Sequence, residues 1–213
     1  MKVLIVLNGE PPEASLLAWR AEEADYVAAA DGGAHALLDA GLRPDLIVGD
    51  MDSFAPETLA PSDTPPQVLR EPDQDSTDFE KALRNLPTAP PPEQIILLGA
   101  TGGRSDHFLT NLLVASEIPE ETRVALDAGD EFIERVTPAR PVRIVGRKGS
   151  VVSLLPLATA EGVTTEGLRW ELKDARMAPG LLLGQSNEAL KDEGRVSITG
   201  GRLFVILPKE APL

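Results

Sequence analysis

The sequence predicts an α/β N-terminal domain, built on a mostly parallel, Rossmann-like sheet with helices on both faces, and an all-β C-terminal domain, an antiparallel sandwich or barrel. Up to residue 126, short apolar runs alternate with stretches of helical periodicity. From Asp127 onward, short β-type runs follow one another between Gly, Pro and charged turns. The net charge of −14 arises entirely in the first part, because acidic and basic residues balance in the second. We therefore predict two domains, residues 1–126 and 127–213.

Composition narrows the class of protein. The 213 residues are 42% hydrophobic and 25% charged, which is typical of a globular protein, and they include no cysteine. The lack of cysteine excludes disulfides, thiolate zinc sites and a cysteine nucleophile. The opening apolar run, Lys2–Leu7, is too short to cross a bilayer and has no signal-peptide pattern, so we expect a cytoplasmic protein without a membrane partner. The acidic charge argues against a nucleic-acid partner, which would need a basic face.

The first elements form a βα pattern. Lys2–Leu7 is a continuous apolar run of the buried-strand type, and Ala14–Ala24 follows with apolar residues at helical spacing. Tyr26–Ala30 is a second strand, and Ala34–Ala40 is a short helix that Gly41 closes. Strands that alternate with helices predict a parallel sheet.

The pattern continues to the end of the first domain. Leu46–Val48 is a third strand, the Pro-rich segment Ala55–Pro66 is a surface connection, and Gln67–Arg70 is a fourth strand. A helix capped by Ser76 or Thr77 should continue to Leu86. After a second Pro-rich link come a strand, a glycine loop and a helix, at Gln94–Leu98, Gly99–His107 and the residues from Phe108 through Leu113.

The second domain reads as short strands. The predicted strands are Phe132–Val136, Val142–Val145, Val151–Leu155, Val196–Ile198 and Leu203–Leu207. Two features there suggest a ligand: Trp170 and the predicted turn Gly184–Asn187. Trp170 is as consistent with a core residue as with a stacking surface, because a buried Trp is usually core.

Carboxylates gather where the predicted strands end. Asp31 follows the second strand, and Asp50 and Asp52 follow the third, which places them in the crevice at the carboxyl edge of a parallel sheet. An Asp-x-Asp pair suits a hard divalent cation such as Mg²⁺. Each Asp alone is more often a turn or cap residue. Carboxylates at the start of the predicted third helix, including Asp78, could equally serve to stabilise the positive end of the helix dipole. The recurrence of acidic motifs along the chain nevertheless favours a cation site.

The glycine loop suits phosphate. Backbone N–H groups of Gly99–Gly103 and the following helix N-terminus are aimed at anions. Arg104 supplies a fixed cation, and Asp106 could hold a metal or position a hydroxyl. His107 is as consistent with a structural role at the helix start as with a catalytic one.

Taken together, these motifs closely resemble the thiamine pyrophosphokinase family, over essentially the whole chain. The motifs are, in order, Asp31-Gly32-Gly33-Ala34, Gly41-x-x-Pro44-Asp45-x-Ile47-x-Gly49-Asp50-x-Asp52-Ser53, Asp73-Gln74-x-x-Thr77-Asp78-Phe79-x-Lys81-Ala82, Gly99-x-x-Gly102-Gly103-Arg104-x-Asp106-His107 and Ser186-Asn187. The resemblance implies Mg²⁺, ATP as co-substrate, and transfer of pyrophosphate to the primary hydroxyl of thiamine with release of AMP. It also implies a thiamine-binding β domain and a homodimer with active sites between subunits.

The resemblance implies residue roles as well. Metal ligands would be Asp50, Asp52 and Asp78, and the catalytic set would add Arg104 and Asp106. The nucleotide would contact Asp31, Gly32, Gly33, Ser53, Gln74, Thr77, Lys81, Thr101, Gly102, Gly103 and His107. Thiamine would contact Gln74, Trp170, Ser186 and Asn187. The chain has Gly184 where the family often has a hydroxyl residue, which removes one thiamine contact.

Two other functions fit the same residues. The carboxylates could serve a Mg²⁺-dependent pyrophosphokinase acting on another heterocyclic alcohol, such as a hydroxymethylpterin. Alternatively, the chain could bind thiamine without catalysis, although the intact carboxylate and arginine set argues against that. Either Asp78 or Asp106 could accept the hydroxyl proton.

Overall fold

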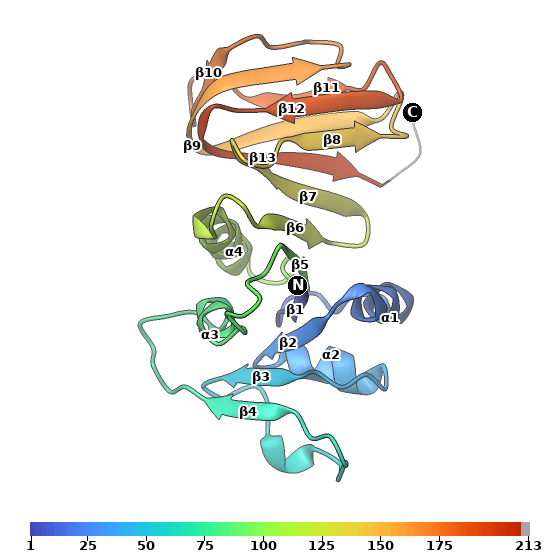
Figure 1. The fold of residues 1–213 in the computed structure, drawn as a ribbon, viewed down its shortest axis with the longest axis vertical. Helices are drawn as coiled ribbons and strands as arrows, with labels where there is room; N and C mark the ends of the chain where they lie inside the picture. The colour runs from blue at the N-terminus through green and yellow to red at the C-terminus, as the bar shows by residue number, and fades with distance from the viewer. Residues whose placement is uncertain (210–213) are drawn as a thin grey trace. The chain divides into compact units, whose positions relative to one another are not determined.

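The computed structural model describes residues 1–209, which fold into two compact units (Figure 1). The first unit comprises residues 1–114 and 126–128, and the second comprises 115–125 and the residues from 129 onward. The domain boundary between residues 126 and 127 stays a prediction. Within residues 1–209, every helix is too short or too polar to cross a membrane.

The first unit is a parallel sheet of five strands in the order β4-β3-β2-β1-β5. The strands are β1 (Lys2–Val6), β2 (Tyr26–Ala30), β3 (Leu46–Gly49), β4 (Gln67–Arg70) and β5 (Gln94–Leu98). The central strand β1 pairs with two neighbours, because Leu4 lies opposite both Val27 and Ile96. Its residues Val3–Val6 are almost fully buried, as expected for a strand covered on both faces.

Helices flank this sheet. They are α1 (Ala14–Glu23), α2 (Gly33–Asp39), α3 (Asp78–Arg84) and α4 (Ser105–Glu117), with a short 3₁₀ turn, η1, at Pro56–Thr58. In Figure 1, α1 and α2 lie on one side of the strands and α3 on the other. That placement follows from right-handed crossovers that run first in one direction from β1 and later return to β5. The predicted parallel sheet with helices is confirmed.

Two local details determine where the helices begin and end. A Cβ on Gly33 would lie 2.2 Å from the carbonyl oxygen of Val6, so only glycine lets α2 start this close to β1. Helix α3 ends at Arg84, two residues earlier than predicted. The side chain of Asn85 donates to the carbonyl of Lys81 and to Glu71, and these bonds compete with the helical pattern.

The second unit is antiparallel. Its strands follow the order β7-β13-β9-β12-β8, and β10 and β11 also pair with β9. Their bounds are β7 (Glu131–Val136), β8 (Val142–Val145), β9 (Val151–Glu166), β10 (Ala175–Met177), β11 (Gly184–Glu188), β12 (Glu193–Ser197) and β13 (Gly200–Pro208). Strand β6 (Arg123–Asp127) contains residues of both units. The predicted antiparallel β region is confirmed.

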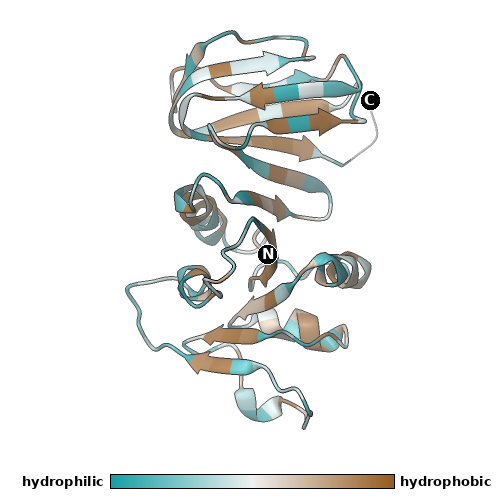
Figure 2. Cartoon of the chain, in the orientation of Figure 1, coloured by the Kyte–Doolittle hydropathy of each residue, from teal (hydrophilic) through white to brown (hydrophobic). Residues whose placement is uncertain are grey.

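Alternating strand residues build the core of this second unit. Val152, Leu154 and Val163 of β9 pack with Leu203 and Val205 of β13 in one buried cluster. Figure 2 shows that hydrophobic residues concentrate along the strands, whereas the connecting loops are mostly hydrophilic.

The structure differs from the predictions for the second half at four strands, β6, β9, β10 and β11. Strand β9 continues past Leu155 to Glu166, because its Ala, Thr and Glu residues pair with neighbouring strands despite their weak strand signal. The predicted turn Gly184–Asn187 is instead part of β11, where a register shift accompanies a positive φ of 57° at Ser186. Strands β6 and β10 were not predicted.

A buried arginine holds part of the second unit together. Arg135 of β7 is 3% exposed and donates to the carbonyls of Ala115, Ile118, Pro119 and Thr122, which follow or end α4. Burial lowers the pKa of this guanidinium to about 10, which leaves it charged at neutral pH. The cation therefore satisfies carbonyls that a helix end would leave without donors.

We predict that Arg135→Ala lowers the free energy of unfolding by about 3–5 kcal/mol, the scale of breaking a buried charged network. Arg135→Lys should lose less, because one ammonium still reaches some of the carbonyls. Urea unfolding measures both. Equal stability of Arg135→Ala and the parent would show that water replaces the guanidinium without cost.

Candidate active site

A crevice of about 920 Å³ lies in the first unit at the carboxyl ends of its strands. Segments that follow all five strands contribute to it, including Asn8, Asp31, Asp50, Gln74 and Gly99. The carboxyl edge of a parallel sheet is the usual ligand site of such folds, and this volume is that of a small-molecule pocket. The predicted position of the acidic motifs at this edge is therefore observed.

Three carboxylates meet in the crevice. Asp31, Asp50 and Asp78 each offer an oxygen, and these atoms all lie within 4.8 Å of one another. They come from the ends of β2 and β3 and from the first residue of α3. Such an arrangement of oxygen ligands suits a hard divalent cation.

Asp31 is the buried member of this group. It is 2% exposed, and its backbone has a positive φ of 44°. Its Oδ2 accepts a hydrogen bond of 3.1 Å from the backbone N–H of Ser53, whereas Oδ1 is buried without a partner among the described residues. Burial, together with the neighbouring carboxylates of Asp52 and Asp78, raises the pKa of Asp31 to about 6. An unpartnered carboxylate oxygen facing other carboxylates is a position that a cation would satisfy.

Asp50 and Asp78 are held by polar partners. The side-chain amide of Gln74 donates to Oδ2 of Asp50 over 2.8 Å and lowers the pKa of that carboxyl. Lys81, which is 2% exposed, donates to Oδ1 of Asp78 over 2.9 Å. Asp50 thus has an amide donor as its partner, and Asp78 is paired with a buried lysine.

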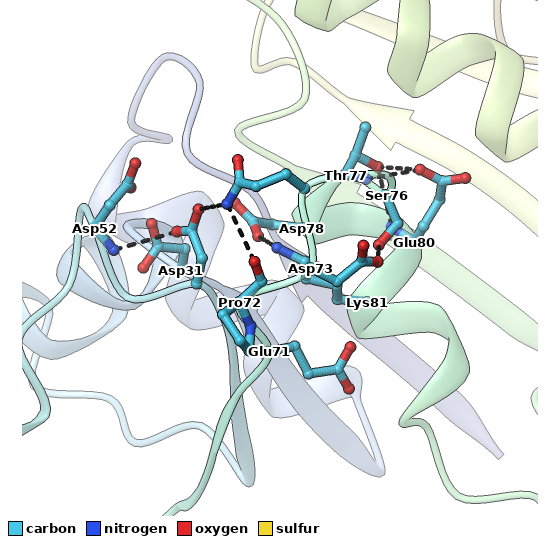
Figure 3. A network of polar contacts seen from close by, with 12 residues as sticks. Asp31, Asp52, Glu71, Pro72, Asp73, Ser76, Thr77, Asp78, Glu80 and Lys81 are labelled. Atoms are coloured by element: carbon cyan, nitrogen blue, oxygen red, sulfur yellow. Dashed lines mark hydrogen bonds and ion pairs between the residues drawn. The ribbon is translucent and has the colours of Figure 1, made fainter.

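A capping box fixes the start of α3. The hydroxyl of Thr77 accepts from the N–H of Glu80, and Glu80 accepts from the N–H of Thr77. Figure 3 shows these reciprocal bonds, with Asp78 next along the chain and Lys81 nearby. Of the two predicted caps, Thr77 is the one the structure uses, and it places Asp78 at the first helical position.

Asp52 lines the crevice but stands outside the group of three. Its Oδ1 accepts a 2.9 Å hydrogen bond from the hydroxyl of Ser53, and its N–H donates to Asp50. The sequence predicted Asp52 as a metal ligand and Asp31 as a nucleotide contact. Asp31 takes the third place in the observed group, and the role of Asp52 stays a prediction.

The glycine loop borders the same crevice. Gly99, Gly102 and Gly103 have positive φ angles of 63°, 77° and 62°, which glycine adopts without strain. Exposed Arg104 binds Asp106 through two hydrogen bonds of 3.1 and 2.6 Å, and this pairing lowers the pKa of the Asp106 carboxyl.

The predicted nucleotide contacts divide into two sets. The crevice is lined by Asp31, Ser53, Gln74, Thr77, Lys81, Gly102, Gly103 and His107, and by Arg104 of the catalytic set. The lining does not include Gly32, Gly33, Thr101 or Asp106. Gly32 and Gly33 are buried against Asn8 and Val6, so they permit close packing behind the crevice.

Sequence reasoning missed several lining residues. Asn8 and Glu10 follow β1, and Thr110 and Asn111 lie on α4. Asn111 donates to the carbonyl of Ala100 over 2.9 Å and so steadies the glycine loop. Asn8 could have been predicted from its position directly after an apolar strand, because a predicted site residue follows every other strand of this sheet.

In the second unit, Trp170 is 60% exposed, so it is not a core residue. The side chain of Asn187, only 6% exposed, accepts from the N–H of Trp170 and donates to its carbonyl, at 3.1 and 2.9 Å. Asn187 also accepts from the N–H of Glu188, so three of the four hydrogen-bonding positions of its amide are bonded to backbone. Ser186 is exposed beside it, and its N–H donates to Ser153.

Two family models match the chain. The model described as thiamin pyrophosphokinase, catalytic domain, matches residues 18–134, and the thiamin pyrophosphokinase vitamin B1 binding domain matches residues 140–203. The crevice carboxylates fall in the first match, and Trp170 and Asn187 fall in the second.

Similar proteins carry the same description. Thiamine pyrophosphokinase 1 of Oryza sativa subsp. japonica is 31% identical to this chain, and the match covers 95% of this chain and 86% of the rice protein. Thiamine pyrophosphokinase of Bacillus subtilis is 27% identical, and the match covers 83% of this chain and 84% of the bacterial protein. The crystal structure of the B. subtilis protein has a TM-score of 0.81 at 24% identity, covering 99% of this chain and all of the other. The structure from Geobacillus thermodenitrificans has a TM-score of 0.77 at 26% identity, with both chains covered in full.

The raised pKa of Asp31 predicts a pH dependence of stability. Between pH 3.8 and about 6 the folded state binds more protons than the unfolded state, so stability falls as the pH rises through this window. Asp31→Asn removes this loss while keeping an acceptor for Ser53. Near pH 7 the variant should therefore exceed the parent by on the order of 1–3 kcal/mol, and the two should converge near pH 4.

Urea unfolding in the presence of a chelator measures this difference. Asp63→Asn, on an exposed segment outside the crevice, is the matched control and should follow the parent at every pH. An Asp31→Asn protein less stable than the parent at neutral pH would mean that the carboxylate stabilises the fold.

Proposed function

The chain belongs to the thiamin pyrophosphokinase family, and we propose that its crevice transfers a pyrophosphoryl group from ATP to the primary hydroxyl of thiamine, releasing AMP. One observation supports the assignment to particular residues. Asp31, Asp50 and Asp78 meet beside a glycine loop, and all lie in the region that the catalytic-domain model matches. In such a crevice, a cation on the carboxylates can neutralise the charge of a triphosphate, and the N–H groups of the glycine loop can bind its oxygens.

The carboxylate group fits Mg²⁺. Asp31, Asp50 and Asp78 would hold it, and the buried, unpartnered Oδ1 of Asp31 supports this fit. Asp52, which lines the same crevice and donates its N–H to Asp50, is the predicted further ligand. Bound Mg²⁺ would neutralise phosphate oxygens and make the β-phosphorus more electrophilic.

Backbone N–H groups and a guanidinium of the crevice would bind the phosphates of the nucleotide. Backbone N–H groups of Gly102 and Gly103 can bind phosphate oxygens, with Arg104 at the rim. The pair between Arg104 and Asp106 is exposed, so it costs little to exchange for a phosphate. Lys81 would stay paired with Asp78 and offset part of the negative charge of the three carboxylates.

A proton must leave thiamine as its hydroxyl oxygen bonds to the β-phosphorus and the bond to the AMP oxygen breaks. A carboxylate within reach of the hydroxyl is the natural acceptor. Of the two predicted candidates, we favour Asp78, because it lines the crevice and Asp106 does not.

The second unit would supply the acceptor site. The thiazolium ring of thiamine is a planar cation, and an exposed Trp face attracts such rings. Arg169 already lies with its guanidinium carbon 5.7 Å from the Trp170 ring centroid, which indicates that this face accepts a cation. Because Asn187 uses three of its four hydrogen-bonding positions on backbone, it would serve thiamine mainly by holding Trp170, with exposed Ser186 beside it to contact the ligand.

The homodimer with active sites between subunits and the cytoplasmic location stay predictions of the sequence. The matched vitamin B1 binding domain supports thiamine as a small-molecule partner.

A turnover assay tests the proposal. The protein with ATP, Mg²⁺ and thiamine should release AMP and form thiamine pyrophosphate in equal amounts. The same assay with a hydroxymethylpterin should give no AMP above background. The reverse pattern would move the activity to another heterocyclic alcohol, and thiamine binding without AMP would indicate a non-catalytic binder.

We predict that Asp50→Asn lowers turnover at least ~100-fold, the scale of losing a key electrostatic group. Asp52→Asn should do the same if Asp52 joins the metal site. Initial rates at saturating Mg²⁺ measure both, with Asp63→Asn as the charge-matched control. Activity of Asp50→Asn within a few-fold of the parent would remove Asp50 from the site.

We predict that Trp170→Ala raises the thiamine KM about 10-fold or more while the ATP KM changes little, since stacking on an aromatic side chain is worth ~1–3 kcal/mol. The variant should melt near the parent temperature, because the ring is 60% exposed. Asn187→Ala should shift the same KM through Trp170. A Trp170→Ala protein with normal thiamine KM would place the acceptor site elsewhere.

A further inference from the structure

The loop that carries Asp50 and Asp52 is held in an unfavourable conformation. Met51, between them, has a positive φ of 62°, which a residue with a side chain adopts at a cost. Strained residues keep such conformations only when surrounding contacts fix them. The contacts that fix this loop therefore determine where its two carboxylates point.

Gln74 holds Asp50 directly, and three further contacts of the loop are made by Ser53. Its N–H donates to Oδ2 of Asp31 over 3.1 Å, and its hydroxyl donates to Asp52 over 2.9 Å. Its carbonyl oxygen lies 2.9 Å from Nε2 of His35. A carbonyl oxygen can only accept, so Nε2 of His35 carries the hydrogen.

The His35 contact is the one that comes from outside the crevice. Asp31 and Asp52 line the crevice, whereas His35 does not. His35 projects from α2, whose start is packed against β1 at Gly33. Its ring meets Phe54 edge-on, with centroids 5.3 Å apart, and Phe54 is 2% exposed. The imidazole is thus supported by a helix on one side and by a buried ring on the other.

We propose that His35 is a positioning residue for the metal site: its Nε2–H fixes the Ser53 carbonyl and, through Ser53, the orientation of the Asp31 and Asp52 carboxylates. This inference rests on the proposed function, since it assumes that the carboxylates bind a divalent cation. His35 touches neither the cation nor the substrates. It sets the geometry of the groups that do.

Two substitutions separate the hydrogen bond from the ring packing. His35→Phe keeps an aromatic edge against Phe54 but removes the donor. His35→Gln keeps an amide donor at a similar reach but removes the ring. Because His35 is exposed, both variants should melt near the parent temperature.

Mn²⁺, a divalent cation that carboxylates bind in place of Mg²⁺, provides a readout that does not need turnover. Titration of each protein with Mn²⁺ at one fixed pH, followed by water-proton relaxation, gives the dissociation constant. His35→Phe should raise it about 2- to 10-fold, the range expected from the loss of one hydrogen bond. His35→Gln should restore most of the affinity. In kinetic assays, His35→Phe should raise the Mg²⁺ concentration needed for half-maximal rate and leave the thiamine KM unchanged.

Equal Mn²⁺ affinity of His35→Phe and the parent would overturn the inference. An equal loss in His35→Phe and His35→Gln would also overturn it, because the ring packing would then be the cause. Absence of Mn²⁺ binding by the parent would do so as well. A parent that binds Mn²⁺ in this pattern but does not convert thiamine would leave His35 as a positioning residue and refute the proposed function instead.

Discussion

The main constraint on the first unit is that three carboxylates meet in its crevice. Oxygens of Asp31, Asp50 and Asp78 lie within 4.8 Å of one another, where their repulsion opposes folding. The fold tolerates this repulsion by distributing it unevenly. Gln74 lowers the pKa of Asp50 and Lys81 pairs with Asp78, while burial raises the pKa of Asp31. A divalent cation bound by these carboxylates would relieve the same repulsion. The free energy that the repulsion costs without metal would therefore favour metal binding.

Much of this could be predicted from the sequence, because the first half follows local rules. Apolar runs gave the strands β2, β4 and β5 at their observed bounds, and Thr77 with Glu80 three residues later is a capping box in the sequence itself. The place of the carboxylates at strand ends then followed from parallel topology. The grouping of Asp31 with Asp50 and Asp78, in preference to Asp52, depends on side-chain directions at positive φ angles, which a sequence pattern does not encode.

The second half was harder to predict for a physical reason. Its strands are specified by partners distant in the sequence, as when Gly184 and Asn187 of β11 pair with Leu154 and Val152 of β9. Residues of weak strand propensity become strands there because a neighbour supplies their hydrogen bonds. Asn187 shows the same dependence: its pattern suggested a ligand contact, and only its position beside the Trp170 backbone shows that its amide is already used.

Strand β9 also bears on how the chain acquires its structure during synthesis. The five strands of the first sheet are complete once Leu98 has been made, and they can pair while the rest of the chain is still growing. In the second unit, β13 is the partner of both β7 and β9, and it is the last strand of the described chain. Strand β7 and one edge of β9 therefore find this neighbour only after residues 200–208 have been made. Until then these strand edges stay open to wrong partners, so errors of strand pairing are a greater hazard in this half than in the first.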